Sequence, residues 1–237
     1  MEEKEILQFF KEKLSENNIE VSNEKLEKFI LYMKNLQEWN TKINLTAIKD
    51  EKDIIIKHFI DSIFINKYLD GKRVIDIGAG AGFPGIPLKI FDDDLNITLL
   101  DAVNKKVLFM NDSITKLDLK NIIALHGRAE DYAHNKEYRE CFDVATSRAV
   151  ANMSTLVEYM LPFVKVGGSC LCMKGPNSEE EINEAKVAIS RLGGCIDEVI
   201  NYSLEDNERC LVVIKKIKKT EQIHPRNQGK PLKNPIR

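Results

Sequence analysis

The sequence lacks the features of a membrane protein, of a disulfide-stabilised protein and of a metal protein. It has no apolar run of about 18 residues, the length that a membrane-spanning helix needs, and residues 1–4 precede no apolar signal core. Its five cysteines are odd in number and form no C-x-x-C pair, the spacing typical of zinc and redox motifs. We therefore expect a cytoplasmic protein with reduced cysteines, without a metal ion and without a membrane partner.

An excess of charge of one sign is also missing, because the net charge of the whole chain is −2. The charge is nevertheless uneven: residues 215–237 hold eight basic residues and one acid, a net charge of +7, which leaves −9 on residues 1–214. Such an asymmetry indicates a basic tail with a polyanionic partner or merely a solvated charged end. Because proline and glycine interrupt residues 220–237, we expect an extended RNA-binding arm there rather than a helix or strand. Its expected phosphate ligands are Arg226, Lys230, Lys233 and Arg237.

Glycine is scarce, at 12 residues, but four glycines stand between positions 78 and 85. The short apolar run Val74–Ile77 before them predicts a buried strand, and the apolar residues after Gly85 predict a helix packed onto a sheet. A strand, a glycine turn and a helix form the nucleotide-binding corner of a doubly wound α/β sheet. The alternative is a glycine turn that serves only the packing of helix on strand.

The spacing of these glycines narrows the expected ligand. The dinucleotide pattern G-x-G-x-x-G requires glycine at position 83, where this chain has Phe83. The chain instead has an aspartate at position 76 and glycines at positions 78, 80 and 82, a pattern that resembles the first motif of S-adenosylmethionine-dependent methyltransferases. A carboxylate at Asp76 suits a ligand with a cationic amino group better than a pyrophosphate, which it would repel.

The alternation of strand and helix patterns predicts three segments. Residues 1–70 are expected to form an N-terminal helical extension, residues 71–219 a Rossmann-like domain and residues 220–237 the basic tail. The expected fold class is α/β, a seven-stranded and mostly parallel sheet with helices on both faces. Its strands are expected near 74–77, 97–101, 122–125, 142–146 and 169–173, with an antiparallel pair at the sheet edge near 195–202 and 210–216.

Ligands of a doubly wound sheet bind at the carboxyl ends of its strands. Four successive strand ends of this chain carry candidate ligands, namely the loop 76–82, Asp101, Ala129–Glu130 and Arg148. Asp101 lies 23 residues beyond Gly78, near the spacing at which an acid binds the ribose hydroxyls of a nucleotide. A pocket built from four strand ends is a more specific signal than the glycine loop alone.

The chain lacks the local signatures of two methylation chemistries. Amine methylation commonly uses an Asn/Asp-Pro-Pro-aromatic motif after the fourth strand, where this chain has residues 147–150 with the sequence Ser-Arg-Ala-Val. Carbon-5 methylation of pyrimidines needs a cysteine on a Pro-Cys or Thr-Cys loop, and none is present. Guanine N7 carries a free lone pair and no proton, so positioning alone can supply most of the catalysis. These absences are consistent with N7 methylation.

Several motifs closely resemble those of the 16S ribosomal RNA guanine-N7 methyltransferases, also called glucose-inhibited division protein B. The basic tail is of the same kind, although His224 and Ile236 replace its usual aromatic residue and leucine. The resemblance covers nearly the whole chain. The other shared motifs are Trp-Asn…Asn-Leu-Thr-Ala-Ile from Trp39, His-x-x-Asp-Ser from His58, Asp-Ile-Gly-x-Gly-x-Gly-Phe-Pro-Gly-Ile-Pro-Leu from Asp76, Arg-Ala-Glu from Arg128 and Ser-Arg-Ala-Val-Ala from Ser147.

The resemblance implies a class I methyltransferase that transfers a methyl group from S-adenosylmethionine to guanine N7 in the decoding-region loop of 16S rRNA, in the small ribosomal subunit. It implies no obligate protein partner. Arg148 faces the substrate end, where it would hold the cofactor carboxylate or polarise the guanine, unless it forms a structural salt bridge. The resemblance places cofactor contacts at Gly78, Phe83, Ala129, Glu130 and Arg148; the strand-end argument adds Asp76, Gly80 and Asp101.

Three alternatives stay open. The basic tail disfavours a small-molecule methyltransferase, Phe83 disfavours an NAD-dependent oxidoreductase, and the strand-end acids Asp76 and Asp101 disfavour a non-catalytic RNA-binding module. Two features have no assigned role. His58 is either a helix residue with both nitrogens satisfied or a functional residue. The polar segment Trp39–Ile48 is expected to leave the helix before it and to wrap the domain as an ordered loop.

Overall fold

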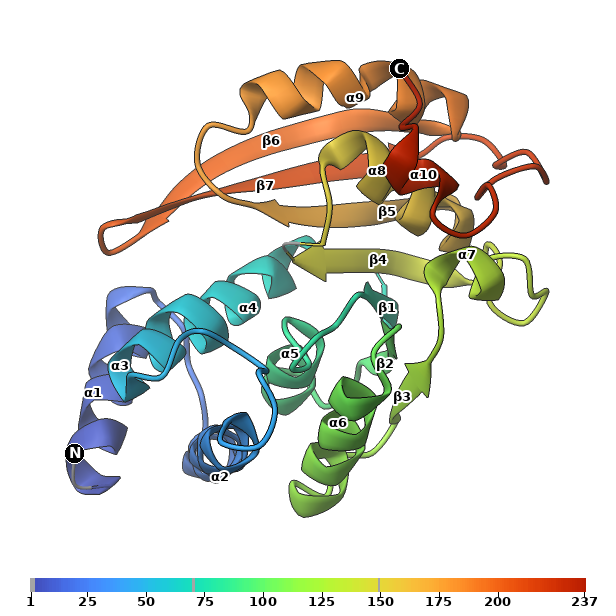
Figure 1. The fold of residues 1–237 in the computed structure, drawn as a ribbon. Coiled ribbons are helices and arrows are strands. Elements are labelled where there is room, and N and C mark those ends of the chain that lie inside the picture. The colour runs from blue at the N-terminus through green and yellow to red at the C-terminus, as the bar shows by residue number, and fades with distance from the viewer. Residues whose placement is uncertain (1–2, 70, 149) are drawn as a thin grey trace.

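The computed structural model describes residues 3–69, 71–148 and 150–237; Met1, Glu2, Asp70 and Ala149, the last within the Ser-Arg-Ala-Val-Ala motif, lie outside these ranges. The described residues form a seven-stranded sheet with helices on both faces (Figure 1). Its strands are β1 (Arg73–Ile77), β2 (Asn96–Asp101), β3 (Ile122–His126), β4 (Phe142–Arg148), β5 (Val164–Lys174), β6 (Gly194–Leu204) and β7 (Asn207–Lys216).

The strand order is β3-β2-β1-β4-β5-β7-β6. Strands β1 to β5 are parallel, and the β6–β7 hairpin is antiparallel and pairs with β5 through β7. The predicted α/β fold with a mostly parallel seven-stranded sheet is therefore confirmed. The carboxyl ends of β1, β2, β3 and β4 lie at one edge, which brings the predicted ligand positions to the same side of the molecule.

The helices follow the sequence patterns with small shifts at their ends. From the N-terminus they are α1 (Glu3–Glu16), α2 (Asn23–Asn40), α3 (Glu51–Ile54), the π-helix η1 (Ile55–Ile60), α4 (Asp61–Phe64) and the 3-10 helix η2 (Ile65–Tyr68). They continue with α5 (Gly85–Phe91), α6 (Asn104–Lys116), α7 (Ala129–Tyr132), α8 (Met153–Met160), η3 (Leu161–Phe163), α9 (Glu179–Arg191) and α10 (Lys230–Lys233).

Successive residues of the central strands enter two apolar cores, one on each face of the sheet. Val74 and Leu171 belong to the core that also takes the N-terminal helices, α5 and α6. Ile75 and Cys172 belong to the core beneath α8 and α9. Because both faces are covered, the central strands read as continuous apolar runs rather than as alternating ones.

The N-terminal helices support the glycine loop. The hydroxyl of Tyr32, a fully buried residue of α2, donates a hydrogen bond to the carbonyl of Ala81 in that loop. The Tyr32 ring packs on Phe59 of η1 and on Phe83, with ring centroids 5.7 and 5.5 Å apart. The predicted boundary near residue 70 falls between η2 and β1, but both sides of it share one apolar core. The extension is thus part of the structure that holds the loop.

The polar segment after α2 is ordered, as its sequence predicted, but the helix runs further than expected. Trp39 and Asn40 form the last turn of α2 instead of leaving the helix. The Asn40 side chain accepts hydrogen bonds from the amides of Leu45 and Thr46, at 2.8 and 3.1 Å, and donates one to the Thr46 carbonyl. This one amide group fixes the loop that follows.

The C-terminal tail is docked on the protein, so the expectation of an extended arm is wrong. Lys230–Lys233 forms the short helix α10, and Ile236 is buried in the core beneath α8. Arg226 donates through its Nη2 to the fully buried Glu158 of α8 at 2.6 Å. The basic residue Lys216 is also buried, with its Nζ bonded to the Leu161 carbonyl at 2.6 Å. Composition revealed the positive charge of this segment but not the buried acid that binds it.

Candidate active site

The glycine loop after β1 forms one wall of a cavity of about 460 Å³. The amide of Gly78 donates to the Leu100 carbonyl of β2 at 2.8 Å, and Gly78 adopts a left-handed φ of +67°. A Cβ at Gly78 would lie 2.5 Å from a methyl of Val150, whereas the nearest atom to a Cβ at Gly80 would be 3.9 Å away. Gly80, also left-handed, therefore leaves its side of the cavity open to a ligand.

The two predicted strand-end acids differ in their surroundings. Asp101 lines the cavity and accepts hydrogen bonds from the amides of Gly80 and Val103, both at 2.8 Å. Asp76 lies beneath the loop, is fully buried, and accepts from the Gly85 amide at the start of α5 at 2.9 Å. Its other oxygen, Oδ1, is buried without a partner among the described residues. Asp101 thus belongs to the cavity wall and Asp76 to the support of the loop.

Burial controls the charge of Asp76. It raises the pKa of this carboxyl to about 7, although the Gly85 amide and Arg148 favour the charged form. A buried carboxylate oxygen without a partner is unfavourable in the protein alone. A cationic group that arrives with a ligand would remedy this, which fits the ligand expected from the sequence.

Phe83, His58 and Arg148 meet at the end of the cavity. The His58 ring stacks on Phe83 with centroids 4.3 Å apart and an interplanar angle of 20°, and the Arg148 guanidinium lies 4.9 Å from the same ring centroid. Burial, followed by the nearby Arg148 charge, lowers the pKa of His58 to about 3, so the imidazole is neutral at physiological pH. Both ring nitrogens of His58 are hydrogen-bonded, as expected for a satisfied helix histidine. The residue also lines the cavity, and a functional role for it stays a prediction.

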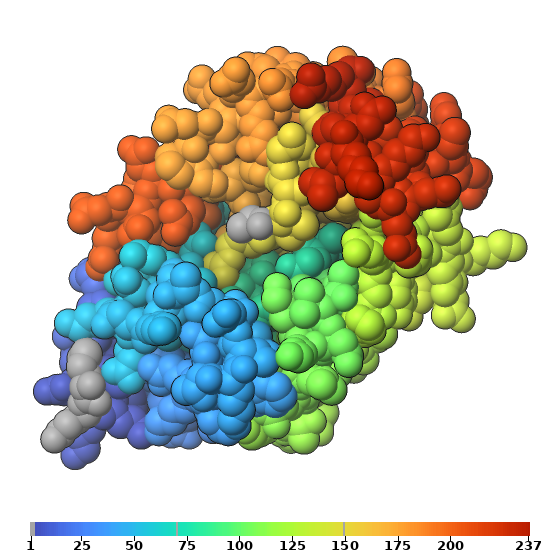
Figure 2. Space-filling view, in the orientation of Figure 1, coloured from blue at the N-terminus to red at the C-terminus, as the bar shows by residue number. Residues whose placement is uncertain are grey.

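A second cavity, of about 280 Å³, adjoins the first and shares His58 and Arg148 with it. It is also lined by Lys57, Lys174 and Arg209, which give it a cationic rim. Figure 2 shows a hollow between the N-terminal helices and the C-terminal half of the chain, where these elements meet. Two adjacent cavities suit a reaction between two bound molecules.

Ala129 and Glu130 do not line either cavity. The Glu130 carboxylate is buried and accepts a hydrogen bond from the Gly229 amide of the tail at 3.0 Å. Beside it, Gln228 donates to Asp131, and a ring nitrogen of His134 lies 2.8 Å from the Pro225 carbonyl. The prediction that Ala129 and Glu130 bind cofactor stays a prediction, and the Glu130 side chain has a partner in the tail.

The tail residues predicted to bind RNA separate into two groups. Lys230, Lys233 and Arg237 are exposed and form no ion pair within the part of the chain that the structure describes. Arg226 is largely buried against Glu158, and this carboxylate also accepts from the Arg226 backbone amide. Exposed cations suit phosphate contacts, whereas Arg226 already has an intramolecular partner.

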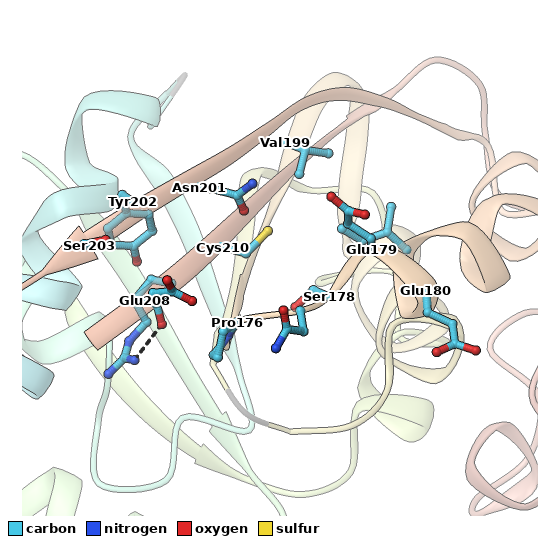
Figure 3. A pocket seen from close by; sticks show the side chains of 13 residues that line it. Pro176, Ser178, Glu179, Glu180, Val199, Asn201, Tyr202, Ser203, Glu208 and Cys210 are labelled. Atoms are coloured by element: carbon cyan, nitrogen blue, oxygen red, sulfur yellow. Dashed lines mark hydrogen bonds between the residues drawn. The ribbon is translucent and has the colours of Figure 1, made fainter. Parts of the chain in front are cut away.

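A larger cavity, of about 590 Å³, has no residue of the glycine loop in its lining. Figure 3 shows the side chains that line it. It is formed by the start of α9 and the β6–β7 hairpin, and three of its side chains are acidic: Glu179, Glu180 and Glu208. Carboxylates in this number repel phosphates and carboxylates. Size alone is therefore a poor guide to the active site of this protein.

Several cavity residues were missing from the sequence prediction. Leu45 and Thr46 reach the first cavity from the loop after α2, and Lys106 reaches it from α6. The Asn-Leu-Thr motif contains two of them, but its sequence gives no sign that a loop 30 residues before the glycines folds over them. Lys106 carries no local signal, because a lysine in the first turn of a helix is common.

The described residues contain neither a candidate metal site nor a candidate membrane span. None of their His, Cys, Asp and Glu side chains forms a cluster of three or more that could hold a metal ion. None of the helices found among residues 3–69, 71–148 and 150–237 is long and apolar enough to cross a membrane.

Substitution of any single cysteine by serine should leave methyl transfer by the folded protein unchanged. Burial raises the pKa of the Cys170, Cys172 and Cys210 thiols, that of Cys172 to about 12, so they are poor nucleophiles. Cys141 and Cys195 line neither cavity. Activity assays of the five variants at matched folded concentration test this, and a covalent RNA adduct trapped at any cysteine would contradict it.

Comparison with known proteins concerns the family and the fold of this chain. The family model described as rRNA small subunit methyltransferase G matches residues 25–212. Proteins named ribosomal RNA small subunit methyltransferase G from Clostridium botulinum and Clostridium beijerinckii are 51% and 53% identical over 224 residues, which is 92% of this chain and 94% of each relative. Precorrin-6y C5,15-methyltransferase from Geobacter metallireducens, 14% identical, has the same fold with a TM-score of 0.51 over 73% of this chain and 91% of that one. The chain therefore belongs to the rRNA small subunit methyltransferase G family.

Proposed function

We propose that this protein transfers a methyl group from S-adenosylmethionine to N7 of a guanine in the decoding-region loop of 16S rRNA. It would act in the cytoplasm, on the RNA of the small ribosomal subunit. The observation that carries the proposal is the pair of adjacent cavities whose common wall is formed by His58 and Arg148. The glycine-loop cavity would take the cofactor, and the cationic cavity beside it would take the acceptor nucleotide.

The residues of the first cavity fit the cofactor. Gly80 leaves the backbone accessible, Asp101 lies where ribose hydroxyls would be bound, and Arg148 is a partner for the methionine carboxylate. Asp76, with its unpartnered Oδ1, would stabilise the cationic end of the cofactor from beneath the loop. When bound, S-adenosylmethionine supplies an electrophilic methyl group on a sulfonium.

The cavity walls favour an acceptor that has no proton to lose. His58 uses both ring nitrogens in hydrogen bonds, and Asp101 accepts two backbone amides. Asp61, the carboxylate of the second cavity, is bonded to Arg148 and Tyr202. Among the described residues that line the two cavities, each carboxylate and the imidazole is thus hydrogen-bonded within the protein, and none is set apart as a general base. Guanine N7 meets this condition.

A calorimetric titration separates this proposal from an NAD-dependent oxidoreductase. S-adenosylhomocysteine should bind the full-length protein in the micromolar range or tighter, and NAD should not bind detectably. Saturable binding of NAD without binding of S-adenosylhomocysteine would contradict the assignment of the glycine-loop cavity.

The exposed cations of the tail should contribute to RNA affinity through phosphate contacts. Substitution of Lys230, Lys233 and Arg237 together by glutamine should reduce the slope of log affinity against log salt by about 2–3, from ~0.7–0.9 for each phosphate contact. Point substitutions are preferable to truncation, because removal of the tail would expose Glu130 and Glu158.

The matched control replaces three exposed lysines elsewhere, Lys4, Lys11 and Lys186, by glutamine. Equal salt slopes for the two triple variants would mean that the tail is only a solvated charged end.

A further inference from the structure

Arg148 is held by three different groups at the wall between the two cavities. Its Nη1 donates to the Lys57 carbonyl at 3.0 Å and to the Asp61 carboxylate at 3.2 Å, and its Nη2 lies 3.0 Å from Nδ1 of His58. A guanidinium carries five N–H groups. Three of them are paired with described residues, and two, one on Nε and one on Nη2, have no partner within the part of the chain that the structure describes.

The contact with Arg148 fixes the tautomer of His58. Because a guanidinium can only donate, Nδ1 of His58 must accept, and the ring proton must lie on Nε2. Nε2 then donates to the Thr46 hydroxyl at 2.9 Å, and that hydroxyl accepts from the Ile48 amide at 3.1 Å. The loop after α2 thus orients the imidazole that orients Arg148.

Asp61 fixes Arg148 from the other side. Its side chain is 2% exposed, and its Oδ1 accepts from the Tyr202 hydroxyl at 2.9 Å and lies 3.6 Å from Nε of Arg209. Tyr202 is itself stacked on Phe64, with ring centroids 3.8 Å apart. The carboxylate therefore joins α4, the end of β4 and the β6–β7 hairpin at one point, which leaves Arg148 little freedom to turn.

We propose that Asp61 and His58 are positioning residues that hold the two remaining N–H donors of Arg148 toward the methionine carboxylate of the cofactor. This inference rests on the proposed function and adds to it the residues that set the geometry of cofactor binding. Neither Asp61 nor His58 needs to touch the cofactor. A guanidinium that is fixed before binding loses less freedom when it pairs with a carboxylate.

The test is a double-mutant cycle on cofactor affinity. Titration calorimetry with S-adenosylhomocysteine is carried out on the full chain, on Asp61→Asn, on Arg148→Met and on the variant with both changes. Asp61→Asn should weaken binding about tenfold in the wild-type background and less than about twofold when Arg148 is already replaced. Asp112→Asn, which removes another ion-paired and partly buried carboxylate, is the matched control and should leave the affinity unchanged.

A merely structural role predicts a different pattern. Asp61→Asn would then weaken binding equally with and without Arg148, in proportion to its loss of thermal stability, and this result would overturn the inference. If Asp61→Asn does not fold, His58→Phe replaces it in the same cycle, since it keeps a ring against Phe83 while it removes the acceptor for Arg148 together with the donor to Thr46. An unchanged affinity in a folded variant, with methyl transfer by the wild type intact, would refute the inference alone. Failure of the wild type to bind S-adenosylhomocysteine would refute the proposed function as well.

Discussion

Replacement of Glu158 by glutamine should lower the free energy of unfolding by about 3–5 kcal/mol, the effect of removing one partner of a buried ion pair. Glu158 is fully buried and accepts from the backbone amide, Nε and Nη2 of Arg226. Glutamine has the same shape but would leave the largely buried Arg226 guanidinium without a counter-charge. Urea unfolding of both proteins measures the difference, with Glu184→Gln on the exposed side of α9 as the control.

The ion pair between Glu158 and Arg226 should also make the stability of the protein depend on pH. Burial would raise the pKa of Glu158, but Arg226 and His224 outweigh it, so the pKa lies below its ordinary value of 4.5. An acid whose pKa is lower in the folded protein than in the unfolded protein stabilises the fold at pH values above its unfolded-state pKa. This stabilisation is lost as the pH falls through the folded-state pKa. The difference in the free energy of unfolding between wild type and Glu158→Gln should therefore be largest at pH 7 and should decrease below about pH 4.5. A difference of less than about 1 kcal/mol at pH 7 would show that the charge of Glu158 does not hold the tail.

Replacement of Asp76 by asparagine should have opposite effects on stability and on cofactor binding. A pKa raised from 3.8 to about 7 means that ionised Asp76 destabilises the protein alone by about 4 kcal/mol above pH 7. The new amide NH₂ would itself be unpartnered, at a cost of about 1–3 kcal/mol, so a net gain of about 1–3 kcal/mol is expected at pH 8. Below about pH 4, Asp76 is protonated in both the folded and the unfolded protein, so the gain in stability should disappear there.

Affinity for the cofactor should fall in the same variant. The loss of a charge-assisted interaction is worth about 1.5–3 kcal/mol, or roughly 10- to 100-fold in the dissociation constant of S-adenosylhomocysteine. The control is Asp197→Asn, which makes the same exchange of a carboxylate for an amide at an exposed position. An Asp76→Asn protein that binds S-adenosylhomocysteine as tightly as wild type would remove Asp76 from the site, whatever its stability.

The strands of the sheet and its mostly parallel character followed from the sequence because each strand end carried a local signal, whereas the order of the strands was seen only in the structure. Val74–Ile77 is buried on both faces and apolar except for Asp76, as expected for a covered parallel strand, and the glycines after it adopt left-handed backbone. The tail had no such signal. Its charges were visible in the sequence, but its fold depends on Glu158, a residue 68 positions away along the chain.

The cavity wall was only partly predictable for the same reason. Arg148 and Phe83 stood at predicted ligand positions, whereas the contacts of Arg148 with His58 and Asp61 span 90 and 87 residues. A histidine and an aspartate on one helical stretch are compatible with many environments. Glu130 shows the converse: it stood at a predicted ligand position, and its carboxylate is bonded to the tail.

Mass analysis of nucleosides from 16S rRNA is the direct test of the proposed methyl transfer to guanine N7. Small ribosomal subunits from cells that lack this protein would be incubated with the purified protein and S-adenosylmethionine, digested, and mapped. We expect one added methyl group at N7 of a guanine in the decoding-region loop, absent without the protein and absent with Arg148→Met. A methyl group on an exocyclic amine, on carbon-5 of a pyrimidine or on no RNA nucleoside at all would contradict this expectation.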